Sequence, residues 1–184
     1  MTLAGLVLAA GQGSRLGRPK ALVTVAGERL VDRAVRALRA GGISTVVVVT
    51  GAAEVGEVDA DTVHNPRWSE GIGSSLRAGL AALPPVTAAL VVLVDQPGVT
   101  PAAVSRLAAQ VGSENDLLAA TYAGRRGHPV VIGRAWWSEV ARTAVGDVGA
   151  RPFLDSNAAV RLIECGDVAS DRDVDTPEDL GRLQ

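Results

Sequence analysis

The chain has 184 residues, of which 47% are hydrophobic and 21% charged, as is typical of one soluble globular domain with a substantial core. A formal net charge of −2 and an aromatic content of 3% exclude the basic, base-stacking surface of a nucleic-acid-binding protein. The single cysteine, Cys165, excludes an internal disulfide bond. The sequence shows neither a cationic leader nor an apolar run of about 18 residues. We therefore expect a cytoplasmic protein without a membrane segment and with one domain over residues 1–184.

Five apolar segments have the composition expected of buried β-strands. Several are rich in Val and do not alternate with polar residues, which is typical of a mostly parallel sheet that helices cover on both faces. The segments are 6–10, 45–50, 88–94, 117–121 and 130–132.

Helical patterns lie between these segments, so the sequence predicts an α/β fold. Apolar residues share one face over 30–38 and over 76–83, and Ser74 and Ser75 are candidate N-caps of the second helix. Two Thr-Pro pairs, which begin at Thr100 and Thr176, predict further helix starts. The turn-rich segment 124–128 predicts a hairpin or an insertion.

A glycine-rich loop with cationic side chains follows the first apolar segment directly, over residues 11–20. Glycine lets the main chain approach a ligand closely, and Arg15 and Lys20 add positive charge, so the loop suits a polyanionic ligand. It matches neither common phosphate-binding motif. Leu16 stands where a dinucleotide fingerprint has its third glycine, and Ala21 follows Lys20 where a Walker loop has Ser or Thr. The alternative is an ordinary glycine-rich turn.

Two acidic segments are candidates for a metal site. Asp95 directly follows the most apolar segment. Open α/β sheets bind ligands just outside the carboxyl ends of such strands. A carboxylate beside a triphosphate is suited to bind Mg²⁺. Asp173 and Asp175 alternate along extended backbone and so point the same way, which makes either one a candidate second ligand. The alternatives are an Asp that starts the turn at Pro97 and an acidic turn with a helix cap.

Three further stretches are candidates for binding a second substrate. Residues 65–75 enter a helix N-terminus, where free amides favour an anion, although a plain capping loop has the same pattern. The loops 125–129 and 146–151 add cations and flexible backbone. His128 is a candidate proton donor or substrate contact, and a structural histidine is the alternative.

One motif near the start of the chain resembles the signature of nucleotidyltransferases with a glycosyltransferase-A-type fold: Leu8-Ala9-Ala10-Gly11-x-Gly13-x-Arg15-Leu16-Gly17-x-x-Lys20. Within this superfamily the whole chain resembles the molybdenum cofactor nucleotidyltransferases, most closely the cytidylyltransferase branch. The resemblance implies a Rossmann-like three-layer α/β/α sandwich with a mostly parallel central sheet. Its other motifs are 65–80, Val94-Asp95-Gln96-Pro97, Gly127-His128-Pro129-Val130, Gly146-Asp147-x-Gly149-Ala150-Arg151 and 173–179.

The resemblance also implies roles for individual residues. Asp95 and Asp175 would ligate Mg²⁺, and Arg15, Lys20 and Asp95 would be catalytic. The acceptor substrate would be bound by Gly71, Ser74, Arg126, His128, Asp147 and Arg151. The nucleotide would be bound by Leu8, Ala9, Ala10, Gly11, Gly13, Ser14, Arg15, Lys20, Ser75 and Asp95.

The reaction implied by the resemblance is transfer of CMP from CTP to the terminal phosphate of molybdopterin, with release of pyrophosphate. Lys20 and Mg²⁺ would neutralise the α-phosphate, and Arg15 would stabilise the departing pyrophosphate. Ala10 favours CTP, because the guanylyltransferase branch has Gly at this position. The expected partners are CTP, a molybdopterin-type phosphate substrate and a molybdoenzyme or accessory protein, with no nucleic acid and no membrane.

Three alternatives remain beside this interpretation. The first is a GTP-dependent molybdenum cofactor guanylyltransferase or a sugar-phosphate nucleotidyltransferase of the same fold. The second is a non-catalytic molybdopterin-binding accessory protein. The third, a dinucleotide-dependent reductase, is disfavoured by Leu16 and by the Thr50-Gly51 pair, which stands where an acidic residue should follow the second strand.

Overall fold

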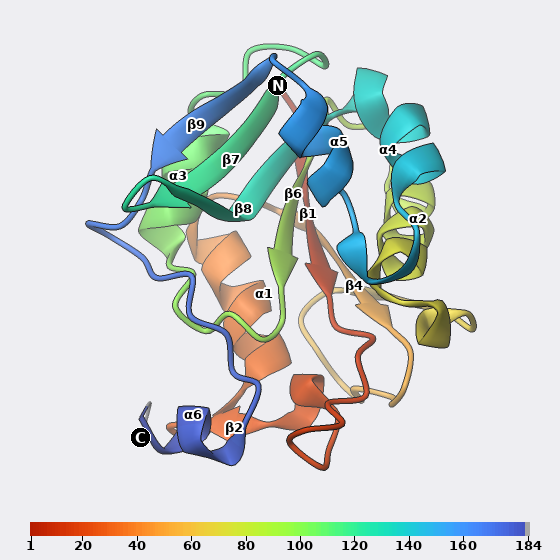
Figure 1. The fold of residues 1–184 in the computed structure, drawn as a ribbon, viewed down its shortest axis with the longest axis vertical. Coiled ribbons are helices and arrows are strands. Elements are labelled where there is room, and N and C mark those ends of the chain that lie inside the picture. Colours follow the sequence, from red (N-terminus) through yellow and green to blue (C-terminus); the bar gives the residue numbers. More distant parts are fainter. Residues whose placement is uncertain (183–184) are drawn as a thin grey trace.

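Within residues 1–182, which the computed structural model describes, seven strands form one central sheet (Figure 1). Their order across the sheet is β5-β4-β1-β6-β8-β7-β9. β8 is antiparallel to both of its neighbours, and every other neighbouring pair is parallel, so the predicted mostly parallel sheet is confirmed. The strands are β1 (Leu3–Leu8), β4 (Thr45–Thr50), β5 (Asp61–His64), β6 (Ala88–Leu93), β7 (Leu117–Tyr122), β8 (Arg125–Gly133) and β9 (Val160–Glu164). A separate antiparallel pair comprises β2 (Thr24–Val25) and β3 (Glu28–Arg29).

Helices cover both faces of the sheet and produce the three layers that Figure 1 shows. α1 (Leu30–Ala40) and α3 (Pro101–Ala108) pack on one face, where Val7 and Val48 enter the core. On the other face, Leu6 and Val49 meet α2 (Ile72–Ala82), α4 (Trp137–Thr143) and α5 (Arg151–Ser156). Successive strand residues enter opposite cores because side chains alternate along a strand. The α/β fold class is confirmed, and none of the described helices is long and apolar enough to span a membrane.

Two strands of the central sheet, and the short pair β2 and β3, were absent from the sequence prediction. β5 and β9 form the two edges of the sheet, and most of their residues are exposed. An edge strand with little buried surface has no continuous apolar run, so the pattern that predicted the inner strands does not detect it. The hairpin predicted around 124–128 is confirmed: β7 and β8 are joined through Ala123 and Gly124, both with positive φ.

Helix starts were predicted correctly in two of three cases. Thr100 caps α3, and Thr176 caps α6 (Pro177–Gly181) in a capping box with Asp179. The prediction of Ser74 and Ser75 as caps was wrong, because α2 begins earlier, after Gly71, and both serines are buried in its first turn.

The order of the strands predicts a crevice at the carboxyl ends of the inner strands. β4 lies on one side of β1 and β6 on the other, so the chain changes direction across the sheet between them. In open α/β sheets, ligands bind at such a switch point, outside the carboxyl ends of the strands. The loop after β1 and Asp95 after β6 both lie there.

Candidate active site

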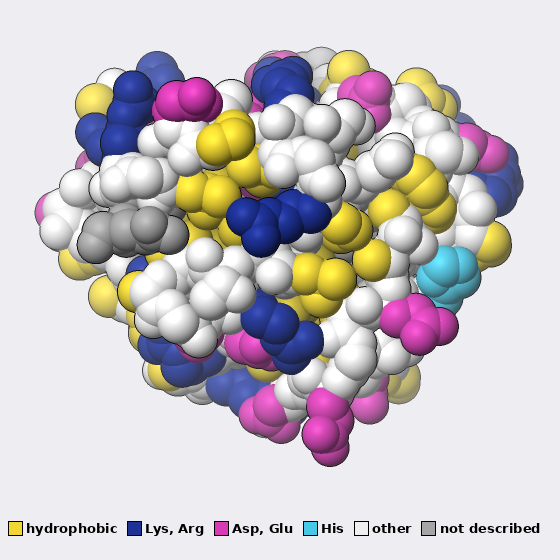
Figure 2. Space-filling view, turned by 90° about the horizontal axis from the view of Figure 1, so that it is seen from below, with side chains coloured by type: hydrophobic (Ala, Val, Ile, Leu, Met, Phe, Trp, Pro, Cys, Tyr) yellow, Lys and Arg dark blue, Asp and Glu magenta, His cyan; other side chains and the backbone are white. Residues whose placement is uncertain are grey.

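The carboxyl ends of β1 and β6 open onto the face of the molecule that Figure 2 shows, where Lys and Arg side chains lie near the centre beside hydrophobic ones. Gly13 gives the loop after β1 its shape. Its φ is +65°, and a Cβ at this position would lie 2.1 Å from the carbonyl oxygen of Arg18. Glycine is therefore required for the turn that returns the chain to Lys20.

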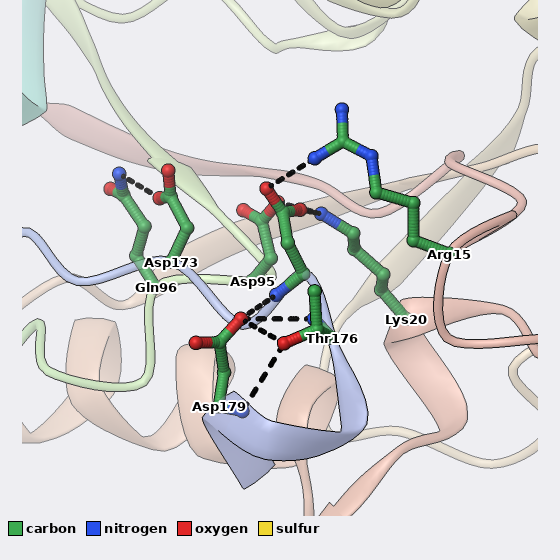
Figure 3. Close-up of polar contacts among 8 residues, drawn as sticks. Arg15, Lys20, Asp95, Gln96, Asp173, Thr176 and Asp179 are labelled. Atoms are coloured by element: carbon green, nitrogen blue, oxygen red, sulfur yellow. Dashed lines mark hydrogen bonds and ion pairs between the residues drawn. The ribbon is translucent and has the colours of Figure 1, made fainter.

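Lys20 joins two carboxylates that come from distant parts of the chain (Figure 3). Its ammonium donates to Asp95 Oδ2 at 2.5 Å and also to the carboxylate of Asp175, which in turn accepts from Arg15 Nη1 at 3.2 Å. Burial alone would lower the pKa of Lys20, but the charges and hydrogen bonds of Asp95 and Asp175 outweigh burial and raise it above its ordinary value. The ammonium is therefore charged at neutral pH.

The C-terminal segment holds Asp175 in place through backbone contacts. Val174 is fully buried, and its amide donates to the carbonyl oxygen of Asp95 at 2.8 Å. The amide of Asp175 donates to Asp179 Oδ2 at 3.1 Å, next to the capping box of α6. Asp173 takes a different partner, since it accepts from Gln96 Nε2 at 2.8 Å (Figure 3). The structure therefore brings Asp175, and not Asp173, to Lys20.

A cavity of about 310 Å³ adjoins this cluster. Three residues predicted to bind the nucleotide do not line it. Ala9 packs in the core, Gly13 shapes the turn, and the Arg15 side chain is 76% exposed beside Asp175. The predicted nucleotide residues that line the cavity are Leu8, Ala10, Gly11, Ser14, Lys20, Ser75 and Asp95.

Trp68 also lines this cavity, although it was not among the predicted site residues. A Cβ on Gly51 would lie 2.5 Å from Trp68 Cβ and 2.8 Å from Ala10 Cβ. Glycine after β4 thus lets Trp68 and Ala10 approach each other and form one wall. The motif over 65–80 contains Trp68, but its spacing in the sequence does not show that it faces Ala10.

A second cavity, of about 400 Å³, lies beside the first. Its floor is apolar and includes Val91, Val130 and Leu154. The predicted acceptor residues Arg126, His128, Asp147 and Arg151 line it, and so do Arg125, Asp171 and Asp173. The two cavities adjoin, because both are lined by Leu8, Ile72, Leu93 and Asp147.

Two predicted acceptor residues lie elsewhere. Gly71 lines the first cavity, and its φ of +100° lets the chain pass close to Gly146 and Asp147. Ser74 lines neither cavity, and its hydroxyl contacts the carbonyl oxygens of Arg67 and Gly71. We therefore assign Ser74 to the internal packing of this helix start.

His128 is neutral at physiological pH. Burial lowers its pKa to about 4, and the charges of Arg151 and Arg126 act in the same direction. A neutral imidazole keeps one N–H for hydrogen bonding but is a very weak acid, so the lowered pKa of His128 favours a positioning contact over a proton donor.

The lowered pKa of His128 predicts a loss of stability in acid. Between pH 6.5 and about 4 the unfolded chain binds a proton that the folded protein does not, so the free energy of unfolding falls as the pH decreases. We expect His128→Gln to remove about 2–3 kcal/mol of this fall. Urea unfolding of both proteins at pH 7 and pH 4.5 measures the difference, and identical pH dependence in the two proteins would contradict it.

The carboxylates at Lys20 fit a divalent cation. Asp95 and Asp175 both reach the same ammonium, so their oxygens converge on one point. Mg²⁺ and similar ions typically take one or two protein carboxylates and complete their shell with phosphate oxygens and water. Within residues 1–182, no group of three or more His, Cys, Asp or Glu side chains forms a metal cluster, so any such ion would depend on the ligand's phosphates as well.

Comparisons with known proteins relate this chain to characterised families. The MobA-like NTP transferase domain matches residues 5–161. Nicotine blue oxidoreductase of Paenarthrobacter nicotinovorans is 41% identical over 194 residues, which cover 97% of this chain and 95% of that protein. A probable molybdenum cofactor guanylyltransferase of Opitutus terrae is 39% identical over 85 residues, covering 44% of this chain and 42% of that protein.

Two solved structures share the fold over the whole chain. The crystal structure of Rv0371c from Mycobacterium tuberculosis H37Rv has a TM-score of 0.81 at 30% identity and covers 100% of this chain and 98% of its own. The structure of the Rv0371c complex with manganese has a TM-score of 0.77 at 28% identity, with the same coverage. The family match includes the glycine-rich loop, Asp95, the residues that line the first cavity and the floor of the second. On this ground the chain belongs to the MobA-like NTP transferase domain family of nucleotidyltransferases.

Proposed function

We propose that this protein transfers a cytidylyl group from CTP to the terminal phosphate of a molybdopterin-type substrate and releases pyrophosphate. The observation that carries the proposal is the pair of adjoining cavities, with Lys20 and Asp95 in the wall of the first. CTP would occupy the first cavity, next to the cations of the glycine-rich loop. The acceptor would occupy the second, where the apolar floor suits a planar ring system and Arg126 and Arg151 suit a phosphate.

In this mechanism an oxygen of the acceptor phosphate attacks the α-phosphorus of CTP. A new P–O bond forms there, and the bond from the α-phosphorus to the oxygen of the departing pyrophosphate breaks. Lys20 exchanges its carboxylate partners for α-phosphate oxygens, and Arg15 contacts the departing pyrophosphate. A divalent cation, Mg²⁺ in our proposal, would be held by Asp95 and Asp175 and would supply further neutralisation of phosphate charge. The acceptor is already a phosphate monoester, so the reaction requires no strong general base, in agreement with the lowered pKa of His128, which makes its imidazole a weak base.

Ala10 provides the test of base preference. Replacing Ala10 with Gly removes a methyl group from the wall that it forms with Trp68, and this should admit a larger base. We expect the ratio of kcat/KM for CTP over GTP to fall about tenfold, the usual worth of one methyl group in a pocket. Pyrophosphate release from each of the four nucleoside triphosphates, with molybdopterin as acceptor, measures the ratio.

Ala9→Gly is the matched control for this experiment. It removes the same methyl group one residue earlier, from a side chain that packs in the core and does not line the cavity. Its CTP to GTP ratio should equal that of the wild type. An unchanged ratio in Ala10→Gly would place base selection elsewhere in the cavity.

A second candidate function follows from the relative that is named a nicotine blue oxidoreductase and is similar over nearly the whole chain. Two features disfavour a dinucleotide-dependent reaction of the usual kind: Leu16 interrupts the fingerprint, and Gly51 follows β4 in place of an acidic residue. Incubation with nicotine blue and NADH or NADPH, followed by absorbance, tests this candidate. Reduction of the dye, with no pyrophosphate released from any nucleotide and acceptor pair, would replace the transferase proposal.

The same assay separates the remaining alternatives. Pyrophosphate release with sugar phosphates in place of molybdopterin would indicate a sugar-phosphate nucleotidyltransferase. Binding of molybdopterin without pyrophosphate release would indicate an accessory protein that holds the pterin. In our proposal the product passes to a molybdoenzyme, directly or through an accessory protein.

A further inference from the structure

Asn65 follows β5 and contacts the first turn of α2, where Ser75 lines the first cavity, the nucleotide cavity of the proposed function. The residue is 3% exposed. The amide oxygen accepts a hydrogen bond from the backbone N–H of Arg67 at 3.0 Å, which determines the orientation of the amide group. The amide nitrogen therefore faces the two serines of the helix start, with Ser74 Oγ at 2.8 Å and Ser75 Oγ at 3.1 Å.

The two serines use their hydroxyl hydrogens differently. Both oxygens accept from Asn65, whose amide group has two hydrogens to donate. Ser74 can donate its own hydrogen to the carbonyl oxygen of Arg67 or Gly71, each at 2.8 Å. For Ser75, the described residues 1–182 offer no such acceptor within hydrogen-bonding distance, and Ser75 lines the nucleotide cavity. The hydrogen of Ser75 is thus the one left for a ligand.

We propose that Asn65 is a positioning residue that makes Ser75 a hydrogen-bond donor to the nucleotide. The ligand must then present an acceptor to Ser75, such as a base carbonyl, a ring nitrogen or a ribose oxygen, and not an amino group. Asn65 acts through Ser75 and does not itself line the cavity. This inference rests on the proposed function for the identity of the ligand as a nucleotide.

The test is a cycle of variants, with binding of CTP and of uncharged cytidine measured by calorimetry. We expect Ser75→Ala to weaken binding of both about 5- to 10-fold, the usual worth of one hydrogen bond. Asn65→Asp keeps the shape of the side chain but can only accept, so it turns the Ser75 hydrogen away from the ligand. We expect a similar loss of affinity in Asn65→Asp. The double variant with Ser75→Ala should bind less than about twofold more weakly than Asn65→Asp alone. Because cytidine carries no phosphate, a loss of cytidine affinity cannot come from repulsion between the new carboxylate and the phosphates.

Ser74→Ala is the matched control, since it removes the neighbouring hydroxyl of the same network but lines no cavity. It should change binding by less than about twofold. Asn65→Ala replaces Asn65→Asp if the buried carboxylate prevents folding, and the thermal midpoint of each variant is measured. A merely structural Asn65 would lower the midpoint and leave the effect of Ser75→Ala undiminished, and this result would overturn the inference.

The outcomes also separate this inference from the proposed function. If wild-type protein binds CTP and the Asn65 and Ser75 variants lose affinity independently, the positioning role is wrong and the transferase proposal stands. If the two losses are coupled but no acceptor yields pyrophosphate, the transfer reaction is wrong and the positioning role stands. A wild-type protein that binds no nucleoside triphosphate would overturn both.

Discussion

Replacing Lys20 with alanine is expected to lower the rate of pyrophosphate release about 10²- to 10³-fold, with the fold unchanged. Lys20 is the one cation of the glycine-rich loop that lines the nucleotide cavity, within the part of the chain that the structure describes. Its ammonium is held between Asp95 and Asp175, so in the proposed reaction it would be desolvated and oriented before the α-phosphate binds. A cation placed in this way stabilises charge in the transition state more than a mobile surface cation does.

Single-turnover release of pyrophosphate at saturating CTP measures this loss, and circular dichroism confirms the fold. Arg18→Ala is the matched control, because Arg18 is an exposed cation of the same loop and does not line the cavity. It should keep at least about one third of the wild-type rate. A Lys20→Ala rate close to that of Arg18→Ala would reject the proposed contact with the α-phosphate.

Replacing Asp95 with alanine is expected to abolish metal-dependent turnover. Asp95 and Asp175 are the two carboxylates that reach the Lys20 ammonium, and the loss of either leaves a divalent cation with a single protein ligand. Asp95 lies in the turn after β6, and Lys20 contacts its carboxylate, so the substitution removes charge at the boundary of the nucleotide cavity. Rates measured across Mg²⁺ and Mn²⁺ concentrations, together with direct Mn²⁺ binding in the presence of CTP, follow the change.

Asp173→Asn is the control for this second experiment. Asp173 belongs to the same acidic segment as Asp175, but it accepts from Gln96 and lines the second cavity. Its loss should leave the metal concentration for half-maximal rate unchanged, while the KM for the acceptor is free to change. Asp95→Ala protein with an unchanged metal response would remove Asp95 from the metal site.

Local patterns in the chain predicted most of the fold. The inner strands are continuous apolar segments, and β4 was predicted with its observed bounds, because helices cover it on both faces. The edge strand β9 escaped prediction for the opposite reason, since its outer residues face solvent and Leu162 is 57% exposed. The caps at Thr100 and Thr176 were predictable because a cap is a contact within four residues.

The candidate site was predicted as separate motifs but not as one arrangement. Ser74 and Ser75 are adjacent and chemically identical; the family resemblance assigned Ser75 to the nucleotide and Ser74 to the acceptor, but Ser75 lines the first cavity whereas Ser74 contacts backbone carbonyl oxygens. Successive residues on a helix point about 100° apart, and the position of α2 against Asn65 decides which hydroxyl faces the ligand. Trp68 likewise becomes a cavity wall only because Gly51, at the end of another strand, leaves room for it.

The sequence by itself determined the α/β class, the glycine-rich loop after the first strand and the family, because each depends on residues that are close together in the chain. Only the tertiary structure decided that Lys20 meets Asp95 and Asp175, which are 75 and 155 residues away. The physical reason is that β1 and β6 are parallel neighbours, so the loops that follow them leave the sheet side by side at the carboxyl ends of the strands. The buried Val174 then draws the C-terminal segment against Asp95, and Asp175 comes to Lys20 with it.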